Sequence, residues 1–142
     1  MKRYHASTKK QTLSPKKVYA IDTGMAHALG FPDEGRLLEN MVFVELKRRG
    51  YEVYYHHEHQ ECDFVVCQHH QIEAVIQVCF DLSDQATRER EFNGFLEAIS
   101  CYGLSYGTVM TLTDDETLTY QQGQQVYQID VLSIWRWLHY QV

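Results

Sequence analysis

The sequence has no long apolar run, and this absence excludes several classes of protein. No stretch of apolar residues is long enough to span a membrane, and the N-terminus lacks the apolar segment of a secretion signal. There is also no Gly-x-x-x-x-Gly-Lys-Ser/Thr loop, so the sequence contains no ATP site of that type. We therefore expect a cytoplasmic protein that makes no membrane contact and does not bind ATP through such a loop.

Cysteine is scarce too, with four residues at positions 62, 67, 79 and 101. Without a secretion signal, these predict reduced thiols rather than a disulfide framework. The sequence shows no repeats, no linker and no second domain. Its 142 residues, 44% hydrophobic and 13% aromatic, are enough for one globular domain with a buried core.

Charge is distributed unevenly along the chain. Residues 1–17 contain no acid and six basic residues: Lys2, Arg3, Lys9, Lys10, Lys16 and Lys17. The remaining sequence holds seven basic and nineteen acidic residues, a net charge of −12. Phosphate contacts supply most non-specific nucleic-acid affinity, so this acidic body predicts weak binding to nucleic acid at most. We expect residues 1–16 to form a solvated basic tail and residues 17–142 to form the domain.

Periodicity and capping signals predict alternating helices and strands. Helices are expected at residues 22–31, 36–49, 85–102 and 131–139, the first opened by Asp22 and the third by Asp84 as N-caps. Strands are expected at residues 17–21, 51–55, 61–67, 72–79, 106–112, 117–120 and 124–129. This order predicts a single α/β domain with a mixed sheet flanked by helices.

The most informative segment is residues 61–79, where two apolar, β-branched runs flank a polar break at residues 68–71. Such a pattern predicts a β-hairpin. Side chains alternate between the faces of a strand, so a turn centred near His70 places Asp63 opposite Gln77. Cys79 follows two residues later on the face of Gln77. These three positions form the frame of a two-strand metal site.

Phosphodiester hydrolysis at such a site needs two carboxylates to hold Mg²⁺ and a lysine near the attacking water. Gln77 offers only a neutral carbonyl oxygen, which weakens metal binding without abolishing it. Cys79 cannot replace the lysine, because a neutral thiol carries no charge and a thiolate carries the wrong one. The frame is present, but two of its three chemical groups are changed.

Four segments together resemble the C-terminal domain of predicted bacterial and archaeal AAA-type ATPases, a domain of unknown function. They are Pro-Lys-Lys-Val-Tyr-Ala-Ile-Asp-Thr-Gly at residues 15–24, Glu-Asn-Met-Val-Phe-Val-Glu-Leu with Arg-Arg-Gly at 39–50, Cys-Asp-Phe-Val-Val at 62–66, and Val-Leu-Ser-Ile-Trp-Arg-Trp-Leu at 131–138. The core of that domain resembles PD-(D/E)XK nucleases. The resemblance therefore implies a restriction-endonuclease-like fold and an ATPase module as partner.

The resemblance also assigns the positions of a catalytic site. Glu39 matches the glutamate that several such nucleases carry on a helix, and Asp63 matches their central acid. The glutamate and lysine of the Glu-Val-Lys strand fall on Gln77 and Cys79. The site is thus expected at Glu39, Asp63, Gln77 and Cys79, with Asp63, Gln77 and Glu39 as ligands for Mg²⁺ or Mn²⁺. A non-catalytic or weakly catalytic interaction module is favoured, and an active Mg²⁺- or Mn²⁺-dependent nuclease with this variant site is the alternative.

Other residues offer competing sites. Lys47, Arg88 and Arg90 are candidates for the missing lysine, although a solvated charge explains each more simply. The Asp-Thr-Gly tripeptide at residues 22–24 also occurs in aspartic proteases. Those enzymes need two paired carboxylates, so an N-cap is the better interpretation.

Histidines and tryptophans provide two further candidates. A zinc site using His59, His69 and one cysteine is conceivable, but the spacing matches no zinc motif and favours exposed loop histidines. Trp135 and Trp137 would be able to stack on a base, although tryptophans in a closing helix more often pack in the core or its rim.

Overall fold

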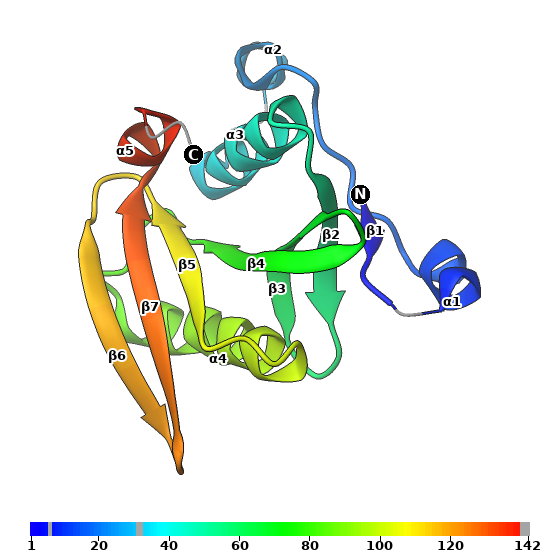
Figure 1. Cartoon of the computed structure of the whole chain (residues 1–142). Helices are drawn as coiled ribbons and strands as arrows, with labels where there is room; N and C mark the ends of the chain where they lie inside the picture. Colours follow the sequence, from blue (N-terminus) through cyan, green and yellow to red (C-terminus); the bar gives the residue numbers. More distant parts are fainter. Residues whose placement is uncertain (6, 31–32, 140–142) are drawn as a thin grey trace.

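The computed structural model describes residues 1–5, 7–30 and 33–139, in which a seven-stranded mixed sheet carries helices on both faces (Figure 1). The strand order is β1-β2-β3-β4-β5-β7-β6. The strands are β1 (Lys2–Arg3), β2 (Glu52–His57), β3 (Glu61–Gln68), β4 (Gln71–Val78), β5 (Tyr106–Thr111), β6 (Glu116–Gln122) and β7 (Gln125–Ser133). The helices are α1 (Thr8–Leu13), α2 (Thr23–Ala28), α3 (Glu34–Arg48), α4 (Gln85–Cys101) and α5 (Ile134–His139).

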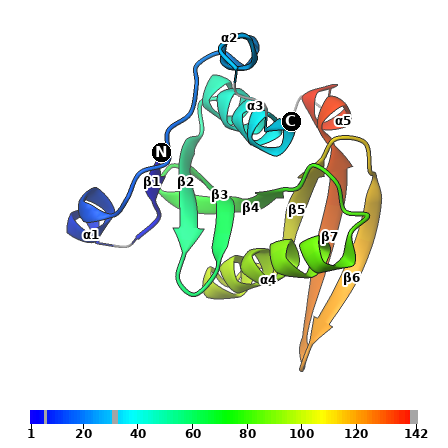
Figure 2. The same cartoon turned by 180° about the vertical axis from the view of Figure 1, so that it is seen from behind.

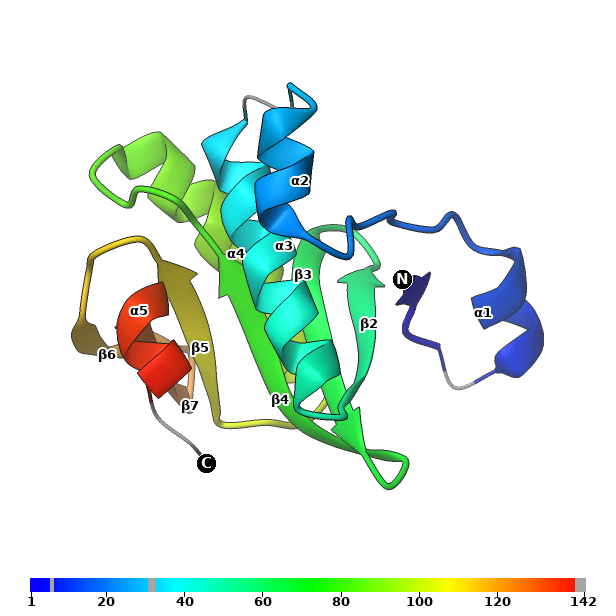
Figure 3. The ribbon, with the colours of Figure 1, turned by 90° about the horizontal axis from the view of Figure 1, so that it is seen from above.

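Helix α3 covers one face of the sheet. Asp33 caps it by accepting a hydrogen bond from the Arg36 backbone N–H at 3.0 Å. Its buried apolar stripe packs against side chains of β3, β4 and β5, forming one half of the core. Figure 3 shows α2 lying beside α3 on this face and α1 lying to the side of the sheet. Helix α3 therefore holds Glu39 above the central strands.

Helix α4 covers the opposite face, as Figure 2 shows from behind. Asp84 caps it by accepting from the Thr87 backbone N–H at 2.7 Å, as predicted. Its predicted apolar face is confirmed, since Phe92, Phe95, Leu96 and Ile99 are all buried. Together with side chains of β4, β5 and β7 they form the second half of the core. The site lies between the two helical layers, at the edge of the central strands.

The predicted hairpin is formed by β3 and β4. His69 and His70 have φ values of 51° and 65°, and this left-handed pair suits a two-residue turn whose twist matches that of the strands. The strands pair with Phe64 opposite Ile76. The next pair outward in this register is Asp63 with Gln77, which is the pairing that alternation predicts.

Several segments differ from those expected. Residues 17–21 form no strand, and the side chains of Val18 and Ile21 point to solvent. Residues 131–133 belong to β7 rather than to the last helix, because Val131 pairs with Val109 in the sheet core. The N-terminus is not a solvated tail, since Lys2 pairs in parallel with Tyr54. The expected end of the first helix at residues 31–32 lies outside the described residues.

A mixed α/β single domain is thus observed. No helix within the described ranges is both long and apolar enough to cross a membrane.

Candidate functional site

Asp63 and Gln77 face each other across the β3–β4 pair and are directly hydrogen bonded. The Gln77 Oε1 atom accepts from the Asp63 backbone N–H at 3.1 Å, while its Nε2 donates to Asp63 Oδ2 at 2.9 Å. The Val78 backbone N–H also donates to Oδ2, at 3.1 Å. Both side chains are buried. The hairpin therefore places the two predicted site residues together and fixes both of them.

A lysine does lie in this site, but it comes from the N-terminal segment rather than from β4. Lys17 Nζ is 2.7 Å from Glu61 Oε1, 2.9 Å from Asp63 Oδ1 and 3.1 Å from Glu39 Oε1. An ammonium group has three donors. Each of the three therefore has a carboxylate partner, and the side chain occupies the position between the acids that a bound cation would take.

The segment carrying Lys17 is held to α3 at several points. We call residues 17–21 the N-terminal strap. The Tyr19 hydroxyl donates to Glu39 Oε1 at 2.5 Å, and its ring stacks on Phe43 with centroids 4.2 Å apart. The Asn40 side chain accepts from the Ala20 backbone N–H at 2.8 Å and donates to the Ala20 carbonyl at 3.1 Å. These contacts explain why the segment is ordered without joining the sheet.

The pKa values of Asp63 and Lys17 are both raised, which favours a neutral acid and a charged ammonium. Burial, followed by the negative charge of Glu39, raises the pKa of Asp63 to about 7, although Lys17 opposes this rise. Burial alone would lower the pKa of Lys17, but Asp63 and Glu39 outweigh it and raise that pKa. Lys17 therefore remains an ammonium at neutral pH. It cannot serve as a general base there.

Cys79 follows β4 directly and is held by a hydrogen bond and by core packing. Its Sγ donates to the Asp81 carbonyl at 3.2 Å, and the side chain packs in the core beneath α4. Burial, with Glu91 nearby, raises the pKa of the thiol to about 11. A neutral thiol at this position agrees with the interpretation that Cys79 does not replace the lysine.

The acidic cluster continues onto α4. Gln77 Nε2 donates to Glu91 Oε2 at 2.6 Å, so one amide bridges Asp63 and Glu91. Arg90 pairs with the other Glu91 oxygen at 2.7 Å. A pocket of about 670 Å³ opens over these groups, and Glu39, Glu61, Cys79 and Arg90 also line it. Glu39, Glu61 and Asp63 thus share Lys17, while Glu91 pairs with Arg90.

The donor set present does not fit a divalent cation. The Mg²⁺ ligands predicted from sequence were the oxygens of Glu39, Asp63 and Gln77. Gln77 instead presents its NH₂ group to the acids while its carbonyl is bonded to backbone, and Lys17 contacts one oxygen of Asp63 and one of Glu39. No three His, Cys, Asp or Glu side chains in the described part of the chain are arranged to hold a metal ion. The arrangement does not present the predicted ligands to a cation, and binding of Mg²⁺ or Mn²⁺ stays a prediction from the sequence.

Of the predicted substitutes for the lysine, one lines the pocket and two do not. Arg90 lines it, paired with Glu91. Lys47 donates to the Tyr51 carbonyl at 2.9 Å, and Arg88 pairs with Glu116 at 3.1 Å. Sequence reasoning missed Lys17, since the apolar run that follows it indicated a strand. The available signal was the alternation of Lys17 and Tyr19 with apolar neighbours.

The other candidates have structural roles. Asp22 accepts from the Met25 backbone N–H at 2.7 Å, which confirms the N-cap. His59 and His69 are exposed, as expected. His56 alone of the neighbouring histidines is buried, where its ring bonds Tyr102 at 2.8 Å and Glu97 at 3.0 Å. Trp137 stacks under the Arg49 guanidinium, 4.4 Å from it, whereas Trp135 is exposed.

Comparison with known proteins places this structure in a family. The chain is 31% identical over 141 residues to the uncharacterized protein MJ1544 of Methanocaldococcus jannaschii. That match covers 92% of the chain but spans only 31% of the length of the archaeal protein. There is no significant match among solved structures. Residues 34–133, well over half of the chain, match the family Domain of unknown function (DUF4143). The protein therefore belongs to this family.

Proposed function

We propose that the chain is a non-catalytic or weakly catalytic interaction module on a nuclease-like, restriction-endonuclease-type core, whose partner is a AAA-type ATPase module. The observation that carries this proposal is the ammonium of Lys17, which contacts Glu39, Glu61 and Asp63 at 2.7–3.1 Å. Carboxylates that elsewhere would hold a metal ion here hold a peptide segment. The acids act as an anchor for the N-terminal strap.

The outward side of this segment supplies the binding surface. Lys17 and Tyr19 point inward, whereas Val18 and Ile21 are 92% and 91% exposed. Met25 and Leu29, which follow on and after α2, are also exposed. Exposed aliphatic side chains that follow closely along one segment favour a protein-binding site, whereas a nucleotide-binding site would require polar and basic groups.

The choice of an ATPase module rests on the sequence resemblance and on the length of the archaeal relative. The chain corresponds to about a third of MJ1544, which leaves most of that protein for other segments. A domain that associates with an ATPase module needs a surface that binds this module. The strap and α2 present one away from the sheet (Figure 3).

Site-specific photo-crosslinking in the source cell tests the partner. A photoreactive side chain at position 18 should capture a protein that contains a Gly-x-x-x-x-Gly-Lys-Ser/Thr loop. The matched control places the same group at Gln124, an exposed position at the tip of the β6–β7 hairpin. No adduct from position 18, or the same adducts from both positions, would contradict the proposal.

The second candidate is an active Mg²⁺- or Mn²⁺-dependent nuclease with the variant Asp…Gln-x-Cys site. It is favoured by one observation, namely that several acids line an open pocket and that a lysine contacts three of them, Glu39, Glu61 and Asp63. It requires Lys17 to leave the acids and the Gln77 amide to turn. Cleavage of DNA or RNA in Mn²⁺ by the wild type but not by Asp63→Asn would establish this alternative. We expect equal, background rates from the two proteins.

A further inference from the structure

Strand β6 is an unprotected edge of the sheet. It ends the strand order, and the β6–β7 hairpin projects beyond α4 in both Figure 1 and Figure 2. Its pairing with β7 runs in one register from Glu116–Val131 to Gln122–Gln125. Natural edge strands are usually blocked by proline, lysine, a bulge or a covering helix. Residues 116–122 contain no proline and no basic residue.

The sequence of this strand is compatible with pairing to itself. We propose that two copies of the chain associate through β6 in an antiparallel arrangement, with Thr119 on the twofold axis. A twofold axis makes the contact self-complementary and closes it at two copies. The opposed pairs are then Glu116 with Gln122, Thr117 with Gln121, and Leu118 with Tyr120.

The register keeps each side chain on its own face of the sheet. Leu118 and Tyr120 pair with Ile129 and Tyr127 of β7, which are buried on the α4 side. Leu118 packs against that core, whereas Tyr120 is 41% exposed. In the proposed pair, Leu118 of each copy lies across from Tyr120 of the other. Cross-strand contacts of an aromatic with an aliphatic side chain stabilise sheets.

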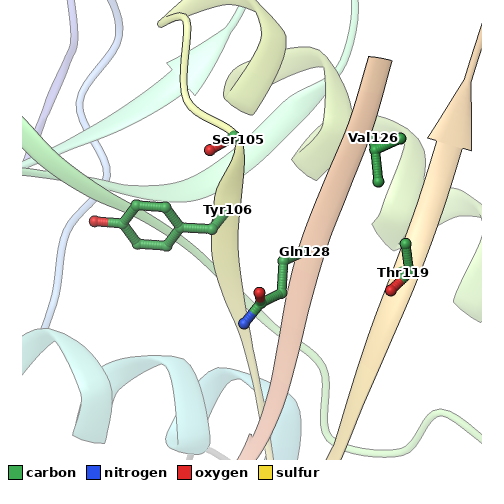
Figure 4. Close-up of a pocket in the computed structure, with 5 residues that line it drawn as sticks. All are labelled: Ser105, Tyr106, Thr119, Val126 and Gln128. Carbon is green, nitrogen blue, oxygen red and sulfur yellow. The ribbon is translucent and has the colours of Figure 1, made fainter. Parts of the chain in front are cut away.

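Charge does not oppose the contact. Glu116 is the one charged residue of β6, is paired with Arg88 at 3.1 Å, and faces the uncharged Gln122. On the opposite face, Thr119 lines a shallow pocket of about 520 Å³ with Ser105, Tyr106, Val126 and Gln128, and none of these is charged (Figure 4). The net charge of −6 repels two copies at long range, so added salt should strengthen the association.

Sedimentation equilibrium of the whole chain tests the inference. The wild type should shift from monomer toward dimer as concentration rises to about 0.3 mM, a range suited to a small interface. Thr119→Lys and Thr119→Glu should each weaken the dimer at least about tenfold, because like charges then meet at the axis. A 1:1 mixture of the two variants should restore it. Asn93→Lys, on the exposed side of α4, is the charge control and should behave as wild type.

Three results would overturn the inference. They are a wild type that stays monomeric throughout this range, equal effects of Thr119→Lys and Asn93→Lys, and a variant mixture that fails to associate. Thr119 is exposed, so thermal unfolding of each variant should match the wild type and show that the fold is intact. The inference uses neither the acidic pocket nor the N-terminal strap, so it stands or fails independently of the proposed function.

Discussion

Carboxylates outnumber cations around the buried Asp63, and this imbalance governs the site at the scale of single residues. Lys17 forms ion pairs with Glu39, Glu61 and Asp63, and Arg90 forms an ion pair with Glu91. Removal of water from an acid that is also close to a like charge favours its protonated form. The raised pKa of Asp63 follows from this arrangement.

The pH dependence of stability should report on Asp63. Its pKa is about 7 in the folded protein, against an ordinary value of 3.8 for an aspartate. The folded state therefore holds the proton more tightly, and the resulting stability is present below about pH 4 and is lost as pH rises through 7. In urea titrations, the unfolding free energy of the wild type minus that of Asp63→Asn should fall from pH 5 to pH 8. A constant difference would show that Asp63 does not titrate in this window.

Substitution of Lys17 should be costly. Lys17→Met leaves three carboxylates without their shared cation, and an unpaired, mostly buried charge destabilises a protein by about 2 kcal/mol or more. Lys16→Met makes the same chemical change at the neighbouring, exposed position and should alter stability by less than about 0.5 kcal/mol. Equal unfolding free energies for the two variants would mean that the ion-pair cluster does not anchor the strap.

Contacts between single residues could be predicted only where they depend on residues close to each other in the sequence. The Asp63–Gln77 pair follows from strand alternation and a two-residue turn, both readable from residues 61–79. The Lys17–Asp63 contact joins residues 46 positions apart and depends on how the strap crosses α3. No periodicity encodes such a contact. The orientation of the Gln77 amide likewise depends on Glu91, which another element supplies.

At the scale of elements, close packing of α4 on the hairpin shapes the pocket. A Cβ atom built on Gly94 would lie 2.1 Å from the backbone oxygen of Glu61, which is a contact that no side chain allows. Glycine at this position lets α4 approach the start of β3. That approach brings Glu91 within reach of Gln77.

Gly94→Ala should therefore destabilise the protein despite the higher helix propensity of alanine. Propensity favours the variant by about 1 kcal/mol. The backbone clash forces α4 away from β3, and overpacking of this kind costs about 1–3 kcal/mol, occasionally more, so we expect a net loss. Chemical denaturation of Gly94→Ala measures it, with Asn93→Ala on the exposed side of the helix as control. A variant at least as stable as wild type would mean that α4 shifts without cost.

Element boundaries were predictable where caps and periodicity agree. Asp84 and the apolar face of α4 were both confirmed. Helix α3 begins at Glu34, two residues before the expected start, because Asp33 rather than Arg36 marks its N-terminus. The end of β7 was assigned to a helix, because the mostly apolar residues 131–139 are compatible with either state. Pairing with β5 decides between the two.

At the scale of the whole molecule, two exposed surfaces are available for association: the strap with α2, and the β6 edge. They lie in different parts of the molecule, as Figure 1 shows. The strap surface consists of side chains that contribute little to the core. It was not foreseen, because the apolar run at residues 18–21 predicted a buried strand.

The strap surface gives a whole-molecule prediction that separates binding from folding. Val18→Ser and Ile21→Ser should each change the unfolding free energy by less than about 0.5 kcal/mol, because both side chains are almost fully exposed. The same substitutions should reduce co-purification of the proposed ATPase partner from the source cell. A loss of stability well above this value would show that the strap packs its aliphatic side chains inward.

The central claim is that Lys17 takes the place of a metal ion among the acids. Calorimetric titration of Mn²⁺ into chelator-treated protein tests it most directly, with wild type, Lys17→Met and the double variant Lys17→Met/Asp63→Asn. We predict no Asp63-dependent binding to wild type. We also predict binding to Lys17→Met that the second substitution removes, because the freed oxygens of Glu39, Glu61 and Asp63 converge where the ammonium lay. Mn²⁺ binding by the wild type that is lost in Asp63→Asn would contradict the claim.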